Sequence, residues 1–241
     1  MIKIEFLFPE IANLYGDPFN VKYLKNSLKD VEVIETSLTD EPRFVKEDID
    51  MIYMGSMSEK AQVMVIDKLK QYKNELQEFI NKNKVVLFTG NAFEVLGKYI
   101  EDEEHNKIEG LGIIDSYSVL DRKHRYNTLF LGECNCDENI KIIGFKATFS
   151  FSYTDNTKDY FCKSIRGCGN NKESVLEGVR INNLFGTYLI GPVLVINPLF
   201  TKYIMKLLGE ENPVLQFEEE AIECYNDKVK IFEKEEINYL Q

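Results

Sequence analysis

The sequence predicts an α/β protein, with a mostly parallel β-sheet flanked by helices and an antiparallel part in its second half. Through the first hundred residues, short apolar runs typical of strands alternate with stretches whose apolar residues recur at helical spacing. After residue 107, several strand-like segments follow one another without helices between them. The length of 241 residues and the hydrophobic content of 44% suit one such domain with a sizeable core.

The first half is expected to open with a strand and then a helix within residues 13–28. Asp17 suits the N-cap position of this helix, and Pro18 at the first helical position loses no needed N–H. The later strands of this half are apolar almost throughout, as in buried parallel sheets. The strands of the first half are expected over residues 2–8, 31–37, 49–55 and 84–90.

Two more helices are expected in the first half. Ser56 and Glu59 fit a capping box at the start of the first of them. The second, over residues 91–100, directly follows a strand. The first helix carries an apolar stripe at spacings of three and four, formed by Val65, Leu69, Tyr72, Leu76 and Phe79.

The second half begins with strand-like segments that are expected to pair largely antiparallel. These segments cover residues 117–120, 126–133, 141–153 and 159–165. A core strand over 184–189 follows, and 192–208 runs into a helix. We therefore expect one domain over 1–208 and an acidic helical C-terminal extension over 209–241. One face of that extension can hold Phe217, Ala221, Cys224 and Ile231.

The composition excludes several function classes. A net charge of −11 and a pI near 4.9 disfavour binding to nucleic acid, because an acidic surface repels phosphates. No apolar run approaches the roughly 20 residues that span a bilayer, and the N-terminus lacks a signal peptide. Five cysteines form no C-x-x-C pair, and the two histidines, His105 and His124, lie among charged residues. We expect a cytoplasmic protein with free thiols, no metal ion and no cofactor.

Two segments resemble the class I glutamine amidotransferases of the cobyric acid synthase (CobB/CobQ) type. LFGTYLIGPVLVINP (184–198) resembles the signature G-T-Y-L-H-G-P…N-P, with Ile190 at the position of the histidine. VLFTGNAFEVLG (86–97) resembles the nucleophile elbow, with Gly90 in the place of the cysteine and Glu94 in the place of a glutamine. In that family the histidine activates the cysteine, so both residues that carry the chemistry are replaced.

Three further blocks add to the resemblance. MGSMSEKAQ (54–62) resembles the loop that helps form the oxyanion hole, and Gly55, Ser56 and Asn91 are its oxyanion-loop-like residues. Two other blocks resemble the amidotransferase subunit of lipid II isoglutaminyl synthases, namely NLYGD with Asn20 and GCGNN with Glu177-Gly178. GFKATFSFS (144–152) departs from the corresponding pattern Gly-Phe-Glu-Asn-His. The motif residues are Asn13, Tyr15, Gly16, Asp17, Asn20, Gly169 and Asn170.

The resemblance implies a flavodoxin-like class I glutamine amidotransferase fold and a Mur-ligase-like (MurT-type) partner subunit. Because the chemistry is missing, we infer a non-hydrolysing partner-binding or regulatory subunit of a Mur-ligase-like amidating system in cell-wall metabolism. Two alternatives stay open. One is an amidotransferase or hydrolase that recruits another residue, such as Glu94 or Cys168. The other is a small-ligand binder that uses the old glutamine pocket, with Glu94, Arg125 and Tyr188 as pocket candidates.

Overall fold

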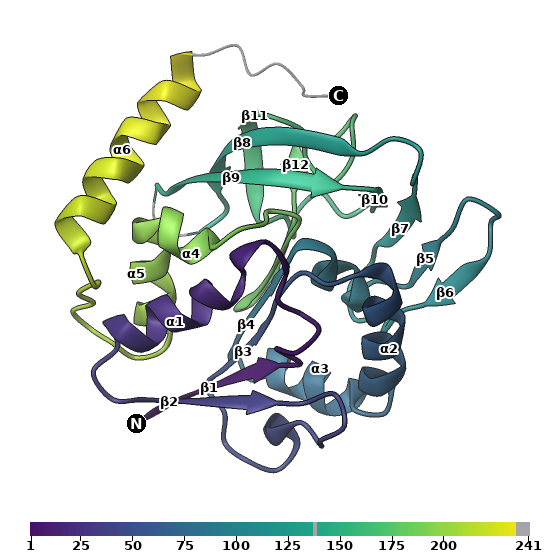
Figure 1. The fold of residues 1–241 in the computed structure, drawn as a ribbon, viewed down its shortest axis with the longest axis horizontal. Coiled ribbons are helices and arrows are strands. Elements are labelled where there is room, and N and C mark those ends of the chain that lie inside the picture. Colours follow the sequence, from purple (N-terminus) through teal and green to yellow (C-terminus); the bar gives the residue numbers. More distant parts are fainter. Residues whose placement is uncertain (137–138, 235–241) are drawn as a thin grey trace.

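The computed structural model, which describes residues 1–136 and 139–234, contains a central six-stranded sheet in the order β13-β14-β4-β3-β1-β2 (Figure 1). Neighbouring strands run parallel except β13 and β14, which pair antiparallel. The order of the five parallel strands is that of a flavodoxin-like sheet, as predicted. The strands are β1 (Ile2–Leu7), β2 (Val31–Thr36), β3 (Met51–Met54), β4 (Val85–Thr89), β13 (Val179–Ile181) and β14 (Leu184–Thr187).

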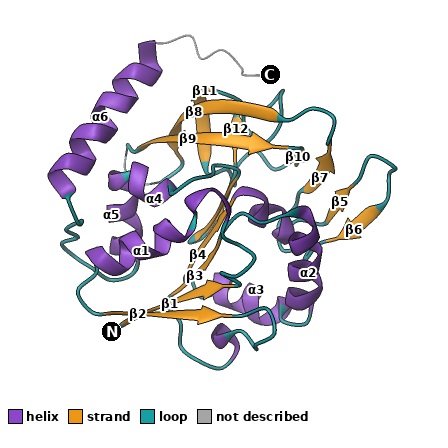
Figure 2. Ribbon diagram, viewed as in Figure 1, coloured by secondary structure: helices purple, strands orange, loops and turns teal. Residues whose placement is uncertain are grey.

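Helices cover both faces of this sheet (Figures 1 and 2). The side chains of β4 alternate between the faces, because successive residues of a strand point in opposite directions. Val85 and Leu87 pack with α1 (Pro18–Ser27) and α5 (Pro198–Leu207). Val86 and Phe88 pack on the other face, with α2 (Glu59–Lys70) and α3 (Lys73–Asn81). The continuous apolar run of β4 is thus explained by burial on both sides.

Three predicted helices differ from those observed. The stripe from Val65 to Phe79 is divided between α2 and α3, although its members at 65, 69, 76 and 79 are buried as expected. Residues 192–208 form α4 (Val193–Ile196) and α5, because Pro198 lacks the N–H that would continue the first helix. The predicted helix over 91–100 is confirmed only in part. A 3-10 helix, η3, covers Gly90–Leu96, and a short strand, β5 (Tyr99–Glu101), follows where the helix was expected to continue.

Residues 99–177 supply two four-stranded sheets, in the orders β10-β7-β5-β6 and β12-β11-β8-β9. Their pairings are antiparallel except that of β5 with β7, so the predicted antiparallel part is confirmed. Figure 2 shows β8, β9, β11 and β12 on the side of the molecule away from β1 and β2. The strands are β6 (Lys107–Glu109), β7 (Tyr117–Leu120), β8 (Tyr126–Cys134), β9 (Lys141–Thr148), β10 (Ser150–Tyr153), β11 (Cys162–Arg166) and β12 (Leu176–Glu177).

The C-terminal helix α6 (Glu218–Lys234) lies along the outside of the molecule (Figure 1). Its packing side is not the predicted face, since Phe217 and Ile231 are exposed. Tyr225 is buried instead and packs against Leu131 of β8 and Ile143 of β9. Tyr225 also donates a hydrogen bond to the carbonyl of Lys141 at 2.7 Å. The side of α6 that packs on the protein is therefore the one that carries Tyr225, whose ring is buried and whose hydroxyl has a partner. Residues 235–241 of the predicted extension lie outside the described residues.

Candidate functional site

A cleft of about 290 Å³ lies beyond the carboxyl ends of the parallel strands. Ser56, Gly90 and Ile190 reach it from the segments that follow β3, β4 and β14. Tyr15 and Phe149 complete its walls from two other loops. The fold therefore brings the two family positions and the oxyanion-like loop together at one site.

Gly90 begins the turn after β4 in a left-handed conformation, with φ of +59°, which glycine adopts without strain. A Cβ atom on residue 90 would lie 2.0 Å from Ser56 Oγ and 3.1 Å from Ile190 Cγ2. The hydroxyl of Ser56 therefore occupies the space in which a side chain at position 90 would begin. The elbow shape persists, and Ile190 is its neighbour as the resemblance implies.

Asp17 holds Ser56 in this place. Its buried Oδ2 accepts hydrogen bonds from the N–H and the hydroxyl of Ser56, both at 2.7 Å, and from the hydroxyl of Thr89 at 2.9 Å. Burial raises the pKa of the Asp17 carboxyl to about 6, against the opposing effect of these hydrogen bonds. Asp17 and Pro18 stand at the N-cap and first helical positions of α1 as predicted, but the Asp17 side chain makes no cap hydrogen bond, because it turns inward to these three donors.

The loop that follows Ser56 is fixed from two sides. Ser58 caps α2 by accepting from the N–H of Ala61 at 3.2 Å, so the predicted capping box of Ser56 and Glu59 is wrong. Ser56 cannot serve because its hydroxyl is bonded to Asp17. Asn91 clasps the backbone of Met57, accepting from its N–H at 3.0 Å and donating to its carbonyl at 2.9 Å. That N–H is therefore engaged and does not point at a substrate in the cleft.

Gly55 packs where no larger residue fits. A Cβ atom there would lie 2.7 Å from the carbonyl of Ala12 and 2.9 Å from Cβ of Asp17. Both distances are shorter than real Cβ contacts allow, so this position requires glycine for its close approach to the loop after β1. Among the three oxyanion-loop-like residues, Gly55 serves packing, while Ser56 and Asn91 form the floor of the cleft.

Glu94 and Tyr188 lie at the inner end of the cleft in one buried hydrogen-bond network. The carboxylate of Glu94 accepts from Tyr188 OH at 2.7 Å, from Gln62 Nε2 at 2.8 Å and from the hydroxyl of Ser150. Burial raises the pKa of Glu94, against the effect of these donors. Burial and the nearby Glu94 carboxylate also raise the pKa of Tyr188 well above its ordinary value. These three donors hold Glu94 in place, which favours a structural role over general-base catalysis.

Arg125 lies at the mouth of the cleft and is exposed. Its guanidinium donates a hydrogen bond to Tyr15 OH at 3.2 Å and stacks over the ring of Phe149 at 5.3 Å. Gly16, next to Tyr15, has φ of +79°, a left-handed conformation that glycine adopts without strain. The predicted pocket candidates therefore occupy different depths, with Glu94 and Tyr188 inside and Arg125 at the rim.

Two other residues of the motif that begins with NLYGD, Asn20 and Asn13, make hydrogen bonds away from the cleft. Asn20 is fully buried; its side-chain amide donates to Tyr53 OH at 2.9 Å, and its side-chain Oδ1 accepts from the N–H of Leu194 at 2.8 Å. It thereby ties α1 to β3 and α4. Asn13 donates to the carbonyl of Pro9 at 2.7 Å and stays at the surface. Neither side chain lines the cleft.

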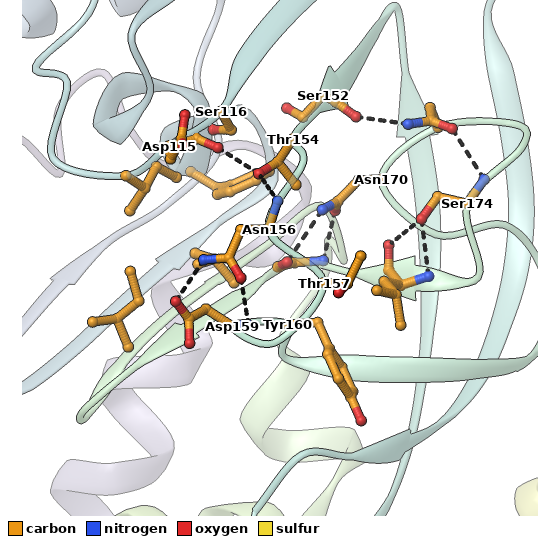
Figure 3. A pocket seen from close by; sticks show the side chains of 17 residues that line it. Asp115, Ser116, Ser152, Thr154, Asn156, Thr157, Asp159, Tyr160, Asn170 and Ser174 are labelled. Atoms are coloured by element: carbon orange, nitrogen blue, oxygen red, sulfur yellow. Dashed lines mark hydrogen bonds between the residues drawn. The ribbon is translucent and has the colours of Figure 1, made fainter.

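Gly169 and Asn170 lie elsewhere, beside a second cavity of about 130 Å³ (Figure 3). The side chain of Asn170 forms two hydrogen bonds with the backbone of Gly178, donating to its carbonyl at 3.2 Å and accepting from its N–H at 2.6 Å. Figure 3 shows the hydroxyl and amide side chains that surround this cavity, including Ser152, Thr154 and Asn156. Ser152 links the two cavities, because its hydroxyl is 2.6 Å from that of Tyr188.

Sequence reasoning missed a buried ion pair between these cavities. Lys146 Nζ lies 3.4 Å from Glu177 Oε1, with 1% and 0% of the side chains exposed. The ammonium also donates to the carbonyls of Cys168 and Gly169, at 3.0 and 2.8 Å. A signal was present in the sequence, since Lys146 stands where the resembling pattern has a glutamate. A lysine at position 146 pairs with the buried carboxylate of Glu177, whereas a glutamate at that position would repel it.

Among the described residues, no cysteine belongs to a disulfide, and none lines the cleft. Cys168, a candidate for a recruited nucleophile, is buried in the glycine-rich loop. His105 and His124 are exposed as expected and lie close to Glu101 and Asp121. Within residues 1–136 and 139–234, no group of three or more His, Cys, Asp or Glu side chains is placed to hold a metal ion. No helix in the same ranges is long and apolar enough to cross a membrane.

A family model of the CobB/CobQ-like glutamine amidotransferase domain matches residues 3–196. The Lipid II isoglutaminyl synthase (glutamine-hydrolyzing) subunit GatD of Streptococcus pneumoniae is 28% identical to this chain over 242 residues, which cover 94% of this chain and 91% of that protein. The subunit of the same name from Staphylococcus aureus is 29% identical over 207 residues, covering 84% and 82%.

Solved structures share the fold. PurLQS from Thermotoga maritima superposes with a TM-score of 0.58 at 14% identity, covering 95% of this chain and 99% of that one. A glutamine amidotransferase from Thermotoga maritima superposes with a TM-score of 0.54 at 10% identity, covering 96% and 93%. The α/β fold of class I glutamine amidotransferases, with its mostly parallel sheet and added antiparallel sheets, is thereby confirmed.

Proposed function

Since the chain belongs to the CobB/CobQ-like glutamine amidotransferase domain family, we propose that it is a member that no longer hydrolyses glutamine. In this proposal it serves as the non-hydrolysing, partner-binding subunit of a Mur-ligase-like amidating system in cell-wall metabolism. Its similarity to two isoglutaminyl synthase subunits over most of their lengths supports the choice of system.

One observation carries the loss of hydrolysis: the place of the nucleophile is filled by Ser56, whose hydroxyl lies 2.0 Å from where a Cβ on Gly90 would be. Covalent hydrolysis of an amide needs a nucleophile on this turn and a base within hydrogen-bond reach. Gly90 offers no side chain, and the neighbouring Ile190 can take no proton. Losing both groups removes many orders of magnitude of rate.

The proposal predicts no ammonia release from glutamine above that of a heat-inactivated sample. The assay is run on the full chain alone and together with its Mur-ligase-like partner, because a subunit can be active only in its assembly. Isolation of the tagged chain from its native cell tests the second half of the proposal. A ligase-like protein is expected at near-stoichiometric amount, and recovery of the chain alone would contradict it.

A second candidate function, binding of a small ligand, is favoured by the cleft itself. About 290 Å³ remains open beside the filled nucleophile position, with polar side chains such as Gln62 and Asn91 next to the apolar Met57 and Ile190. Pockets of this mixed character hold small molecules. Thermal unfolding in the presence of glutamine and glutamate tests it. If glutamine or glutamate raises the Tm of the wild-type protein and does not raise that of Ser150→Trp, ligand binding in the cleft is supported. If neither compound changes the Tm of the wild-type protein, ligand binding is contradicted and partner binding remains the proposed function.

A further inference from the structure

The second cavity, of about 130 Å³, is shaped by a motif that the proposed function leaves unexplained. Asn170 and Asn171 of the GCGNN block line it, together with Gly178. The two hydrogen bonds between Asn170 and Gly178 fix this wall. These motif residues therefore belong to the second cavity and not to the cleft.

Side-chain amides hold the loops around this cavity (Figure 3). Oδ1 of Asn156 accepts hydrogen bonds from the N–H groups of Lys158 and Asp159, at 3.0 and 3.3 Å. The amide of Asn171 donates to the carbonyl of Ser152 at 2.9 Å. Bonds of this kind fix the backbone of a loop locally. The loops therefore keep the cavity open by their own hydrogen bonds, as in a preformed ligand site.

Three polar groups of the lining are left for an occupant. Among the described residues, no hydrogen bond reaches the hydroxyls of Ser116 and Thr157 or Oδ1 of Asp159. Ser116 is only 8% exposed, and a polar group at that depth normally has a partner. Oδ2 of Asp159 accepts from Asn156 Nδ2 at 2.6 Å, which holds the carboxylate in place and leaves its other oxygen available.

The lining also has an apolar part. Phe93, Ile114 and Val179 are buried side chains that contribute to it. Water can bond to the polar groups but gains nothing from these apolar side chains. A molecule that carries both hydrogen-bonding groups and a carbon skeleton satisfies both parts of the lining.

The charge of the lining is negative. Asp115 and Asp159 line the cavity, whereas no Lys, Arg or His of the described chain does. Asp115 is paired with Lys98, and Asp159 has no such partner among the described residues. On a chain of net charge −11, the Asp159 carboxylate therefore repels anions and attracts a cation.

The volume sets the size of the occupant. At about 30 Å³ for each water molecule, the cavity has room for about four of them. A skeleton of about three carbon atoms with its polar substituents is of comparable size.

We propose that the second cavity binds a small hydroxylated amine. The ammonium group pairs with Oδ1 of Asp159, and the hydroxyls bond to Ser116 and Thr157. The carbon skeleton packs against Phe93. Because a charge-assisted hydrogen bond is roughly twice as strong as a neutral one, the ammonium group contributes most to affinity. The site is separate from the cleft, so it does not depend on the loss of glutamine hydrolysis or on the partner.

Three probes with the same three-carbon skeleton test this assignment on the full-length chain. Serinol (2-amino-1,3-propanediol), glycerol and glycerate carry a positive, no and a negative charge at pH 7. The Kd of each follows from the shifts of amide signals of residues at the cavity, such as Gly178, in ¹H–¹⁵N NMR titrations at constant ionic strength. Serinol is expected to bind in the millimolar range, glycerol about tenfold more weakly, and glycerate not at all.

Single substitutions test the named contacts. Asp159→Asn keeps an oxygen for Asn156 and should raise the Kd of serinol about tenfold, while the Kd of glycerol stays within about twofold. Thr157→Val should raise the Kd of serinol and of glycerol alike, by about threefold, because both lose the same hydroxyl partner. Asp155→Asn is the matched control, at an exposed position of the same loop outside the lining, and should leave all three probes unchanged.

Two results would overturn the proposal. If none of the probes gives saturable shifts at the cavity, the site takes water only. If serinol binds Asp159→Asn as tightly as wild type, or glycerate binds as tightly as serinol, the assignment of an amine ligand is wrong. The same spectra show that each variant is folded, because signals remote from the cavity should stay where they are in wild type.

Discussion

The double variant Gly90→Cys/Ile190→His is expected to remain inactive toward glutamine, whereas the triple variant that adds Ser56→Gly is expected to release ammonia. Restoring the two family residues leaves the new Cβ about 2 Å from Ser56 Oγ, so the thiol cannot take the geometry of attack. Removing the hydroxymethyl group of Ser56 clears that space. Asp17 keeps two of its three hydrogen bonds in the triple variant, from the N–H of residue 56 and from Thr89.

The triple variant should exceed the double variant at least about 100-fold in kcat/KM, a difference typical of restored alignment in an active site. Gly90→Cys alone should lower the free energy of unfolding by about 3 kcal/mol, from the left-handed backbone and the overlap together. Ser56→Gly alone is the control and should stay inactive. Robust turnover by the double variant would show that Ser56 moves aside and that the rest of the site is intact.

Asp17→Asn is expected to remove a pH dependence of stability. The native carboxyl has its pKa raised from 3.8 to about 6, so the native state binds its proton more tightly than the unfolded state does. Stability from this group is therefore greatest below pH 3.8, falls as the pH rises to about 6, and stays low above that. The fall amounts to about 3 kcal/mol, at 1.36 kcal/mol for each unit of pKa shift.

Urea unfolding of wild type and Asp17→Asn at several values from pH 4 to pH 7.5 measures this effect. Glu5 and Glu94, whose pKa values burial also raises, act in the same direction in both proteins and cancel in the difference. Asp40→Asn, at an exposed position, is the control and should parallel wild type. A constant difference between wild type and Asp17→Asn across the pH range would mean that the Asp17 carboxyl is not held in a costly environment.

Much of the fold follows from the sequence because the parallel strands carry a strong local signal. The runs at 49–55 and 84–90 are apolar throughout, and only burial on both faces of a sheet explains that. Local signals failed where long-range contacts compete for the same side chain. Asp17 and Ser56 both look like helix caps, yet each finds its partner in the other, 39 residues away.

The sequence predicted that certain residues would lie near one another, but it did not predict the contacts they make. The motif spacing places Gly90 and Ile190 next to each other, and the structure has them in contact range. Ser56 fills the vacated space because its side chain points there from the segment after a neighbouring strand. The spacing of the motifs along the sequence gives no information about that direction. Likewise, Gly169 and Asn170 belong to a motif but lie beside a different cavity, where Asn170 is bonded to Gly178.

The most direct test of the central claim is quantification of ammonia from glutamine by the wild-type chain, alone and in complex with its ligase-like partner. The account predicts a rate equal to the heat-inactivated control in both cases, because no side chain at positions 90 and 190 can attack or accept a proton. Steady release of ammonia that is abolished by Cys168→Ser or Glu94→Gln would contradict it, and would identify an amidotransferase with a recruited catalytic residue.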